Sequence, residues 1–86
     1  MKIWQVSEHD IADPEEAAEC PNACFLSREG AVGFVEECAQ DEAKRWKDDE
    51  DIDTELGWDK HEAELIDLEF GNVVVRWVLH EVEVRP

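Results

Sequence analysis

Basic residues are scarce in this 86-residue sequence, which carries eight Lys and Arg residues against 24 Asp and Glu residues. Its formal net charge at pH 7 is therefore -16. Lys and Arg are the residues that hold DNA, RNA and anionic membranes, so this deficit argues against direct binding to any of these polyanions. A surface this acidic favours a basic protein as its partner.

Long apolar runs are also absent from the sequence. No stretch reaches the length of the apolar region of a signal peptide or of a membrane span. The three cysteines, Cys20, Cys24 and Cys38, cannot all pair within one chain, and an odd number without a signal peptide indicates reduced thiols. These absences predict a cytoplasmic location.

Side chains suited to catalysis or metal binding are few. Two serines, one threonine, no tyrosine and three dispersed histidines give no recognisable nucleophile, base and orienting group. Structural zinc sites use two closely spaced pairs of ligands, whereas this sequence has only one such pair, Cys20 and Cys24. The acidic run that starts at Asp49 fails as a calcium loop, because Thr54 replaces the required Gly and Lys60 the required Glu. We therefore expect no enzyme activity, no metal site and no cofactor.

Apolar residues are nevertheless sufficient for a folded domain. Hydrophobic residues make up 43% of the chain and include four Trp and three Phe. A chain of this length supports one hydrophobic core, so we expect a single domain over residues 1–86.

Hydrophobic patterning predicts short elements at the start of the chain. In residues 2–8, Trp4 and Val6 alternate with polar residues, as in a strand covered on one face. A short helix is predicted over residues 14–19, where Pro and two Glu follow an Asp. The apolar segment 23–26 fits either a brief strand or an extended lead-in.

A long helix is predicted from the N-cap Ser27 to about Lys47. Its apolar positions recur at helical spacing and form one stripe: Ala31, Val32, Val35, Cys38, Ala39, Ala43 and Trp46. Residues 48–59, with seven acidic residues and no basic one, are predicted to form an acidic connector.

The last third of the chain predicts a β-hairpin with a two-residue turn at Gly71 and Asn72. Such a turn fixes the register. The predicted core-facing pairs are Phe70 with Val73, Leu68 with Val75, and Ile66 with Trp77. The predicted pairs on the other face are Asp67 with Arg76, Glu69 with Val74, and Leu65 with Val78. Near His80 the alternation changes phase, which indicates a bulge or a bend.

Together these elements predict an α+β fold, in which a mostly antiparallel sheet with a C-terminal β-hairpin packs against one long α-helix. The predicted core residues are Trp4, Val35, Trp46, Ile66, Leu68, Val75 and Trp77.

The acidic excess is larger than solubility requires, since a net charge of magnitude about 2–8 suffices for a small domain. Carboxylates three or four residues apart on a helix would form a regular negative surface, similar in spacing to a phosphate backbone. The residues predicted to bind a basic partner are Glu29, Glu36, Glu37, Asp41, Asp48, Asp49, Glu50, Asp51, Asp53 and Glu55.

In length, charge, the Asp48-Asp49-Glu50-Asp51 run and the α+β pattern, the chain resembles the small acidic inhibitors encoded by phages. These include anti-CRISPR and anti-restriction proteins that act as DNA mimics. The resemblance implies a non-catalytic, stoichiometric blocker of a nuclease or nucleic-acid-binding complex, acting in the host cytoplasm.

Two other functions fit the same sequence. Acidic bacterial immunity proteins, which neutralise toxic nucleases, are similar in size and charge. Alternatively, a small adaptor or subunit domain could use Trp58, other exposed apolar residues and the hairpin edge to bind a partner or a second copy of itself. High salt should weaken an acidic-to-basic interface and spare an apolar one.

Overall fold

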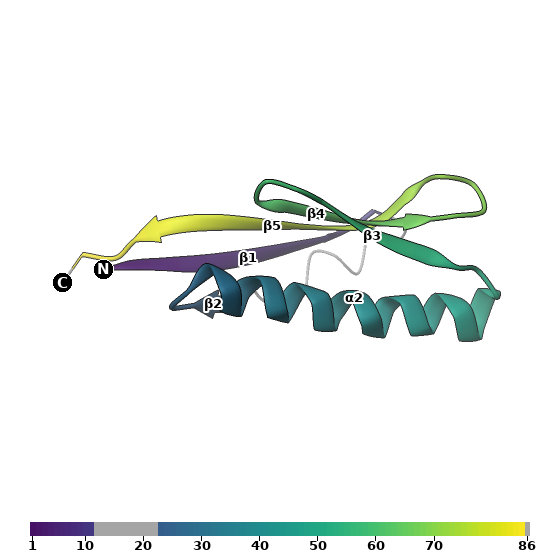
Figure 1. Ribbon diagram of the computed structural model, residues 1–86, viewed down its shortest axis with the longest axis horizontal. Coiled ribbons are helices and arrows are strands. Elements are labelled where there is room, and N and C mark those ends of the chain that lie inside the picture. Colours follow the sequence, from purple (N-terminus) through teal and green to yellow (C-terminus); the bar gives the residue numbers. More distant parts are fainter. Residues whose placement is uncertain (12–22, 86) are drawn as a thin grey trace.

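An antiparallel sheet of five strands and one helix packed on a single face of it make up the described part of the chain (Figure 1). The structure is a computed structural model that describes residues 1–11 and 23–85. The strands are β1 (Lys2–Asp10), β2 (Ala23–Phe25), β3 (Thr54–Asp59), β4 (Glu62–Asp67) and β5 (Val73–Glu83), in the spatial order β2-β1-β5-β4-β3. The predicted α+β class is confirmed, whereas the helix predicted at residues 14–19 lies outside the described residues.

The two longest strands, β1 and β5, form the centre of the sheet. Their register is uninterrupted from the pair Lys2 and Glu83 to the pair Asp10 and Val75. There is accordingly no bulge at His80, which pairs with Gln5 within this regular ladder. The apolar residues beyond His80 instead lie past the end of the core, where they are exposed.

Helix α2 (Arg28–Glu50) confirms the predicted N-cap and apolar stripe. The Ser27 hydroxyl accepts a hydrogen bond from the Gly30 amide at 3.1 Å, which satisfies one of the unpaired amides of the first turn. Ala31, Val35 and Ala39 are buried against the sheet. These short side chains, four residues apart, let the helix lie close to the strands.

The predicted acidic connector over residues 48–59 is wrong. The helix continues through Glu50, and residues 54–59 form the edge strand β3, which pairs with β4 from Thr54 to Asp59. The alternation of Leu56 and Trp58 with Glu55, Gly57 and Asp59 is a strand pattern. Backbone pairing with β4 therefore prevails over the mutual repulsion of the acidic side chains.

The predicted register of the C-terminal hairpin is also wrong. Leu65 pairs with Val75 and Ala63 with Trp77, so the register is displaced by three residues from the predicted one. An odd displacement exchanges the two faces of a strand. Ala63 and Leu65 are consequently buried, while Leu68, predicted in the core, is 55% exposed.

Asp67 explains the longer turn. Its Oδ1 accepts hydrogen bonds from the amides of Glu69 at 2.7 Å and Phe70 at 3.0 Å, and its carbonyl accepts one from the amide of Gly71 at 2.8 Å. An aspartate that holds its own turn in this way competes with the tighter Gly-Asn turn. Asp67 is buried, so its carboxylate belongs to the turn and does not pair with Arg76 as predicted.

Substitution Asp67→Ala is expected to lower the free energy of unfolding by about 1–3 kcal/mol, because two loop amides lose their acceptor in a partly buried place. Urea unfolding measures the change. Asp67→Asn keeps an acceptor oxygen and should cost clearly less. Equal stability of Asp67→Ala and the unmodified chain would contradict this role of the carboxylate.

The core lies between α2 and the facing side of the sheet. Its fully buried hydrophobic residues are Val6, Ala31, Val35, Ala39, Ala63, Leu65, Val74, Val75, Trp77 and Leu79. Of the predicted core, Val35, Val75 and Trp77 are buried, and Trp4 and Trp46 pack against them partly buried. Ile66 is only half-buried, because the displaced register turns it to the other face of the sheet.

Candidate protein-binding surface

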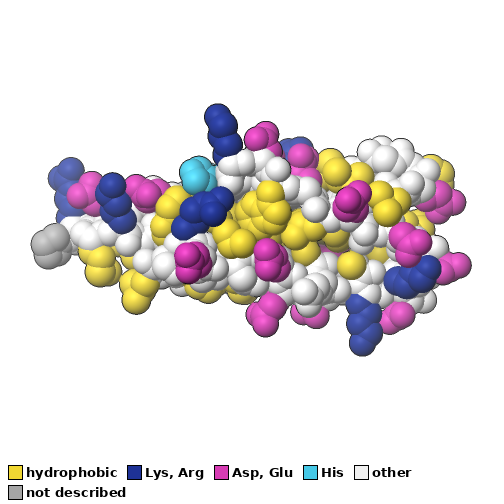
Figure 2. All heavy atoms as spheres, viewed as in Figure 1, with side chains coloured by type: hydrophobic (Ala, Val, Ile, Leu, Met, Phe, Trp, Pro, Cys, Tyr) yellow, Lys and Arg dark blue, Asp and Glu magenta, His cyan; other side chains and the backbone are white. Residues whose placement is uncertain are grey.

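From residue 28 onward, acidic charge is concentrated in α2 and in the segment that follows it. Helix α2 has eight acidic and four basic residues, and residues 51–70 have eight acidic residues against one Lys. Residues 71–86, which include β5, are balanced, with two acidic and two basic residues. Figure 2 shows acidic side chains gathered at the end of the molecule where α2 ends. Within residues 28–85 the negative charge therefore lies mainly on α2 and residues 51–70, and β5 carries little of it.

All ten residues predicted to bind a basic partner are exposed. Nine of them lie on α2 or directly after it, and we call these nine the acidic helix surface: Glu29, Glu36, Glu37, Asp41, Asp48, Asp49, Glu50, Asp51 and Asp53. Helical spacing places Glu37, Asp41 and Asp48 along one line on the side away from the sheet. From Glu29 to Asp48 this surface extends about 28 Å along the helix axis.

Lys47 orders the C-terminal end of this surface. Its Nζ lies 3.3 Å from Asp51 Oδ1 and 3.2 Å from Asp53 Oδ1. Hydrogen bonds to Asp53 and Asp51 raise the pKa of Lys47. Asp51 also ends the helix, since it takes a left-handed conformation and its amide donates to the Lys47 carbonyl. One cation thereby fixes two carboxylates in place and leaves a net negative charge.

Glu55 does not join the acidic helix surface. It lies on β3 and belongs to the sheet face turned away from α2, because Leu56 on the same strand packs toward the core. The neighbouring strand carries Glu62 and Glu64 on that same face, where Arg76 binds both at 2.7 Å and 2.8 Å. The structure thus divides the predicted surface between two sides of the molecule.

An apolar side chain that the sequence had assigned to the core, Leu68, lies beside the acidic helix surface. Leu68 and Phe70, in the β4–β5 loop, are 55% and 69% exposed. The Leu68 amide donates to the Asp53 carbonyl at 3.0 Å. A shallow hollow of about 290 Å³ here is lined by Asp51, Ile52, Asp53, Leu68 and Glu69. The sequence signal for this exposure is Asp67, because an aspartate can bind the amides that follow it and stabilise a longer turn.

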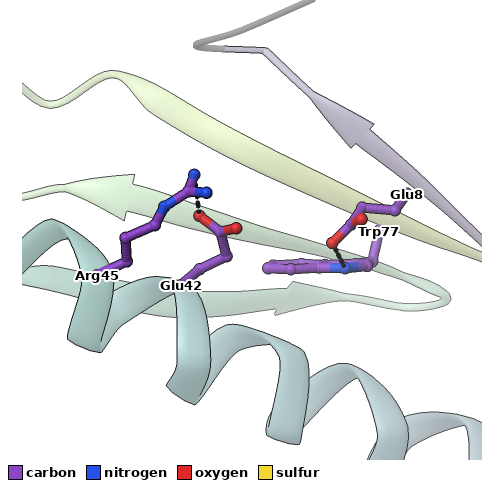
Figure 3. Close-up of polar contacts among 4 residues, drawn as sticks. All are labelled: Glu8, Glu42, Arg45 and Trp77. Carbon is purple, nitrogen blue, oxygen red and sulfur yellow. Dashed lines mark hydrogen bonds and ion pairs between the residues drawn. The ribbon is translucent and has the colours of Figure 1, made fainter. Parts of the chain in front are cut away.

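Two further carboxylates, Glu8 and Glu42, are half-buried and bound to neighbouring side chains. Between the helix and the sheet, Glu8 Oε1 accepts a hydrogen bond from Trp77 Nε1 at 2.9 Å, and Glu42 pairs with Arg45 at 3.0 Å (Figure 3). Burial raises the pKa of the nearby Cys38 thiol, and Glu8 raises it further. That thiol is consequently held in its protonated, weakly nucleophilic form at neutral pH.

Neighbouring side chains hold His61 in place. His61 accepts a hydrogen bond from Arg28 Nε at 3.3 Å, and its ring packs against that of Trp4 at a centroid distance of 5.2 Å and a tilt of 56°. Cys24 is exposed on β2, and Cys20 lies outside the described residues. Across residues 1–11 and 23–85, no three His, Cys, Asp or Glu side chains converge as metal ligands would.

The only helix in the described part of the chain is too polar to span a bilayer. No family model, curated protein or solved structure matches this chain.

Proposed function

We propose that this protein is a non-enzymatic inhibitor that presents the acidic helix surface to a basic nucleic-acid-binding protein and excludes nucleic acid from it. One observation carries the proposal: nine exposed carboxylates are held on and directly after a single 23-residue helix. The action would be that of an anti-CRISPR-like DNA mimic in the cytoplasm of a host cell. It requires no cofactor and no catalytic residue.

Rigidity supports this proposal. The helix is fixed to the sheet by Ala31, Val35 and Ala39, so its carboxylates keep their relative positions before any partner binds. A preorganised surface loses little conformational entropy on binding. A row of fixed negative charges can then be matched by Lys and Arg side chains that normally neutralise phosphates.

The position of the acidic residues also supports a role in binding, because they do not stabilise the fold where they lie. Asp48, Asp49 and Glu50 occupy the last turn of α2, where the helix dipole favours cations and disfavours anions. Within the described residues none of these three is in a salt bridge. Their placement costs folding free energy, and binding of a basic partner would offset that cost.

An immunity-type inhibitor of a toxic nuclease would use the same surface against a basic active-site cleft. An adaptor that binds through apolar contacts is a second candidate, favoured by the exposure of Leu68 and Phe70. Leu68 lies beside Asp51 and Asp53 and would serve the inhibitor as an apolar anchor within a charged interface.

Salt dependence tests the proposal against the adaptor. The tagged protein is used to capture partners from host lysate at about 50 mM and about 500 mM salt, conditions that differ strongly in screening. We expect a nucleic-acid-binding protein or nuclease to be captured at low salt and largely lost at high salt. Capture of an unrelated protein that is equally strong at both salt concentrations would contradict the inhibitor and favour the adaptor.

A further inference from the structure

Strand β3 (Thr54–Asp59) is an edge strand whose outer side carries no strand in the described part of the chain. The bond from the Leu68 amide to the Asp53 carbonyl continues its register with β4. Residues of an antiparallel pair alternate between those bonded to the neighbour and those pointing away. Since Asp53 points toward β4, the backbone groups of Thr54, Leu56 and Trp58 point outward.

The two sides of this edge differ chemically. Glu55, Gly57 and Asp59 lie on the sheet face away from α2, and all three are exposed. In the described part of the chain neither Glu55 nor Asp59 takes part in a salt bridge, whereas their neighbours Glu62 and Glu64 are bound to Arg76. Trp58, on the other face of the strand, is 36% exposed. The edge therefore offers unpaired backbone groups, two carboxylates and an indole.

The acidic side chains of β3 determine which kind of strand can pair with its edge. Pairing with a second copy of β3 would bring Glu55 and Asp59 close to like charges, which destabilises a sheet. Some edge strands are protected against pairing with any other strand by a proline, a bulge or an inward-pointing charge. None of these features occurs in β3. A basic extended segment meets no such obstacle.

We propose that the β3 edge binds an extended basic segment of the inhibited protein as a sixth strand of the sheet. Lys or Arg at every second position of that segment faces Glu55 and Asp59, and the intervening apolar side chains pack beside Trp58. This inference rests on the proposed function and adds a second contact on the side of the molecule that the acidic helix surface does not reach.

The probe is a synthetic peptide with alternating Arg and Val, blocked at both ends, and its control is a peptide of equal composition with the Arg and Val residues in separate blocks. Amide hydrogen exchange is followed by NMR. The alternating peptide should slow exchange of the outward Thr54, Leu56 and Trp58 amides at least tenfold, and the block peptide should not. Equal protection by both peptides, or no protection of these amides, would overturn the inference.

A pair of variants tests the backbone contact. Trp58→Ala and Trp58→Pro both remove the indole, but only proline removes the outward amide, a change that edge strands tolerate. We expect the peptide to bind Trp58→Pro at least tenfold more weakly than Trp58→Ala. Equal affinities would overturn the inference. Should Trp58→Pro fail to fold, two peptides are compared instead, one N-methylated at its odd-numbered residues and one at its even-numbered residues. Strand addition predicts that one of these peptides loses binding and the other keeps it. Any other result would overturn the inference.

Failure of this inference is distinguishable from failure of the proposed function. If the natural partner is captured with full salt sensitivity and Trp58→Pro captures it as well as Trp58→Ala does, the inhibitor stands and the sixth strand is wrong. If salt has no effect on capture, the inhibitor is wrong whatever the peptide does.

Discussion

Replacement of Asp48, Asp49 and Asp51 by Lys is expected to weaken binding of the basic partner by at least about 100-fold. Loss of one desolvated charge pair costs about 2–5 kcal/mol, and each 1.4 kcal/mol corresponds to about tenfold in affinity. Three adjacent reversals add repulsion to that loss. Partner capture at low salt, followed by titration with the purified partner, measures the change.

The triple variant should remain folded. Lys at positions 48 and 49 suits the C-terminal end of the helix dipole, with a gain of about 0.3–1 kcal/mol each. The pair between Lys47 and Asp51 that is lost is fully exposed and screened by solvent, so its loss costs little. Lys also tolerates the left-handed conformation of Asp51, since Lys60 has nearly the same φ, 55° against 54°.

A matched pair of double variants controls for net charge. Asp48→Lys with Asp49→Lys and Glu81→Lys with Glu83→Lys change the charge of the chain equally. The second pair lies at the opposite end of the molecule, on β5. Only the first pair should weaken binding strongly. Equal weakening by both would mean that overall charge, and not the acidic helix surface, determines binding.

Substitution Trp77→Ala is expected to lower the free energy of unfolding by about 3–5 kcal/mol, a large part of the stability of a small domain. Trp77 is completely buried between helix and sheet. Its loss leaves a cavity and removes the donor from the Glu8 carboxylate. Urea unfolding should show a much lower midpoint, with the variant partly unfolded at physiological temperature.

Two further variants separate packing from hydrogen bonding at this site. Trp77→Phe keeps most of the ring and loses the indole N–H, so it should cost about 1–3 kcal/mol. Trp58→Ala changes a partly exposed Trp on the edge strand and should cost far less than Trp77→Ala. A Trp77→Ala variant as stable as Trp58→Ala would contradict the assigned core.

Elements with a strong local pattern could be predicted from the sequence. Ser27 and the recurring Ala31, Val35 and Ala39 define α2 without reference to the rest of the fold. The alternation of Trp4 and Val6 likewise defines β1. In both cases the apolar side chains of the local pattern are also those that pack into the core, so local and tertiary preferences agree.

The hairpin shows why the rest could not be predicted. Gly71 and Asn72 favour a two-residue turn, but Asp67 binds the amides that follow it and stabilises a longer one. The choice depends on burial of Asp67 within the finished sheet, which a local pattern does not contain. The strand at residues 54–59 was missed because its high charge obscured the alternation.

The candidate surface was predicted in composition but not in arrangement. Exposure of the carboxylates followed from their position outside the apolar stripe of α2. The separation of Glu55 from them depends on β3 being a strand. The approach of Leu68 to the acidic end depends on the true hairpin register. Both are tertiary properties.

Competition with nucleic acid tests the central claim most directly. The purified partner is bound to labelled duplex DNA, and this protein is added in increasing amounts while the fraction of bound DNA is followed. The proposed function predicts complete displacement at about one inhibitor per DNA-binding site, abolished in the Asp48, Asp49 and Asp51 triple Lys variant. A ternary complex, in which the partner holds DNA and this protein together, would contradict it.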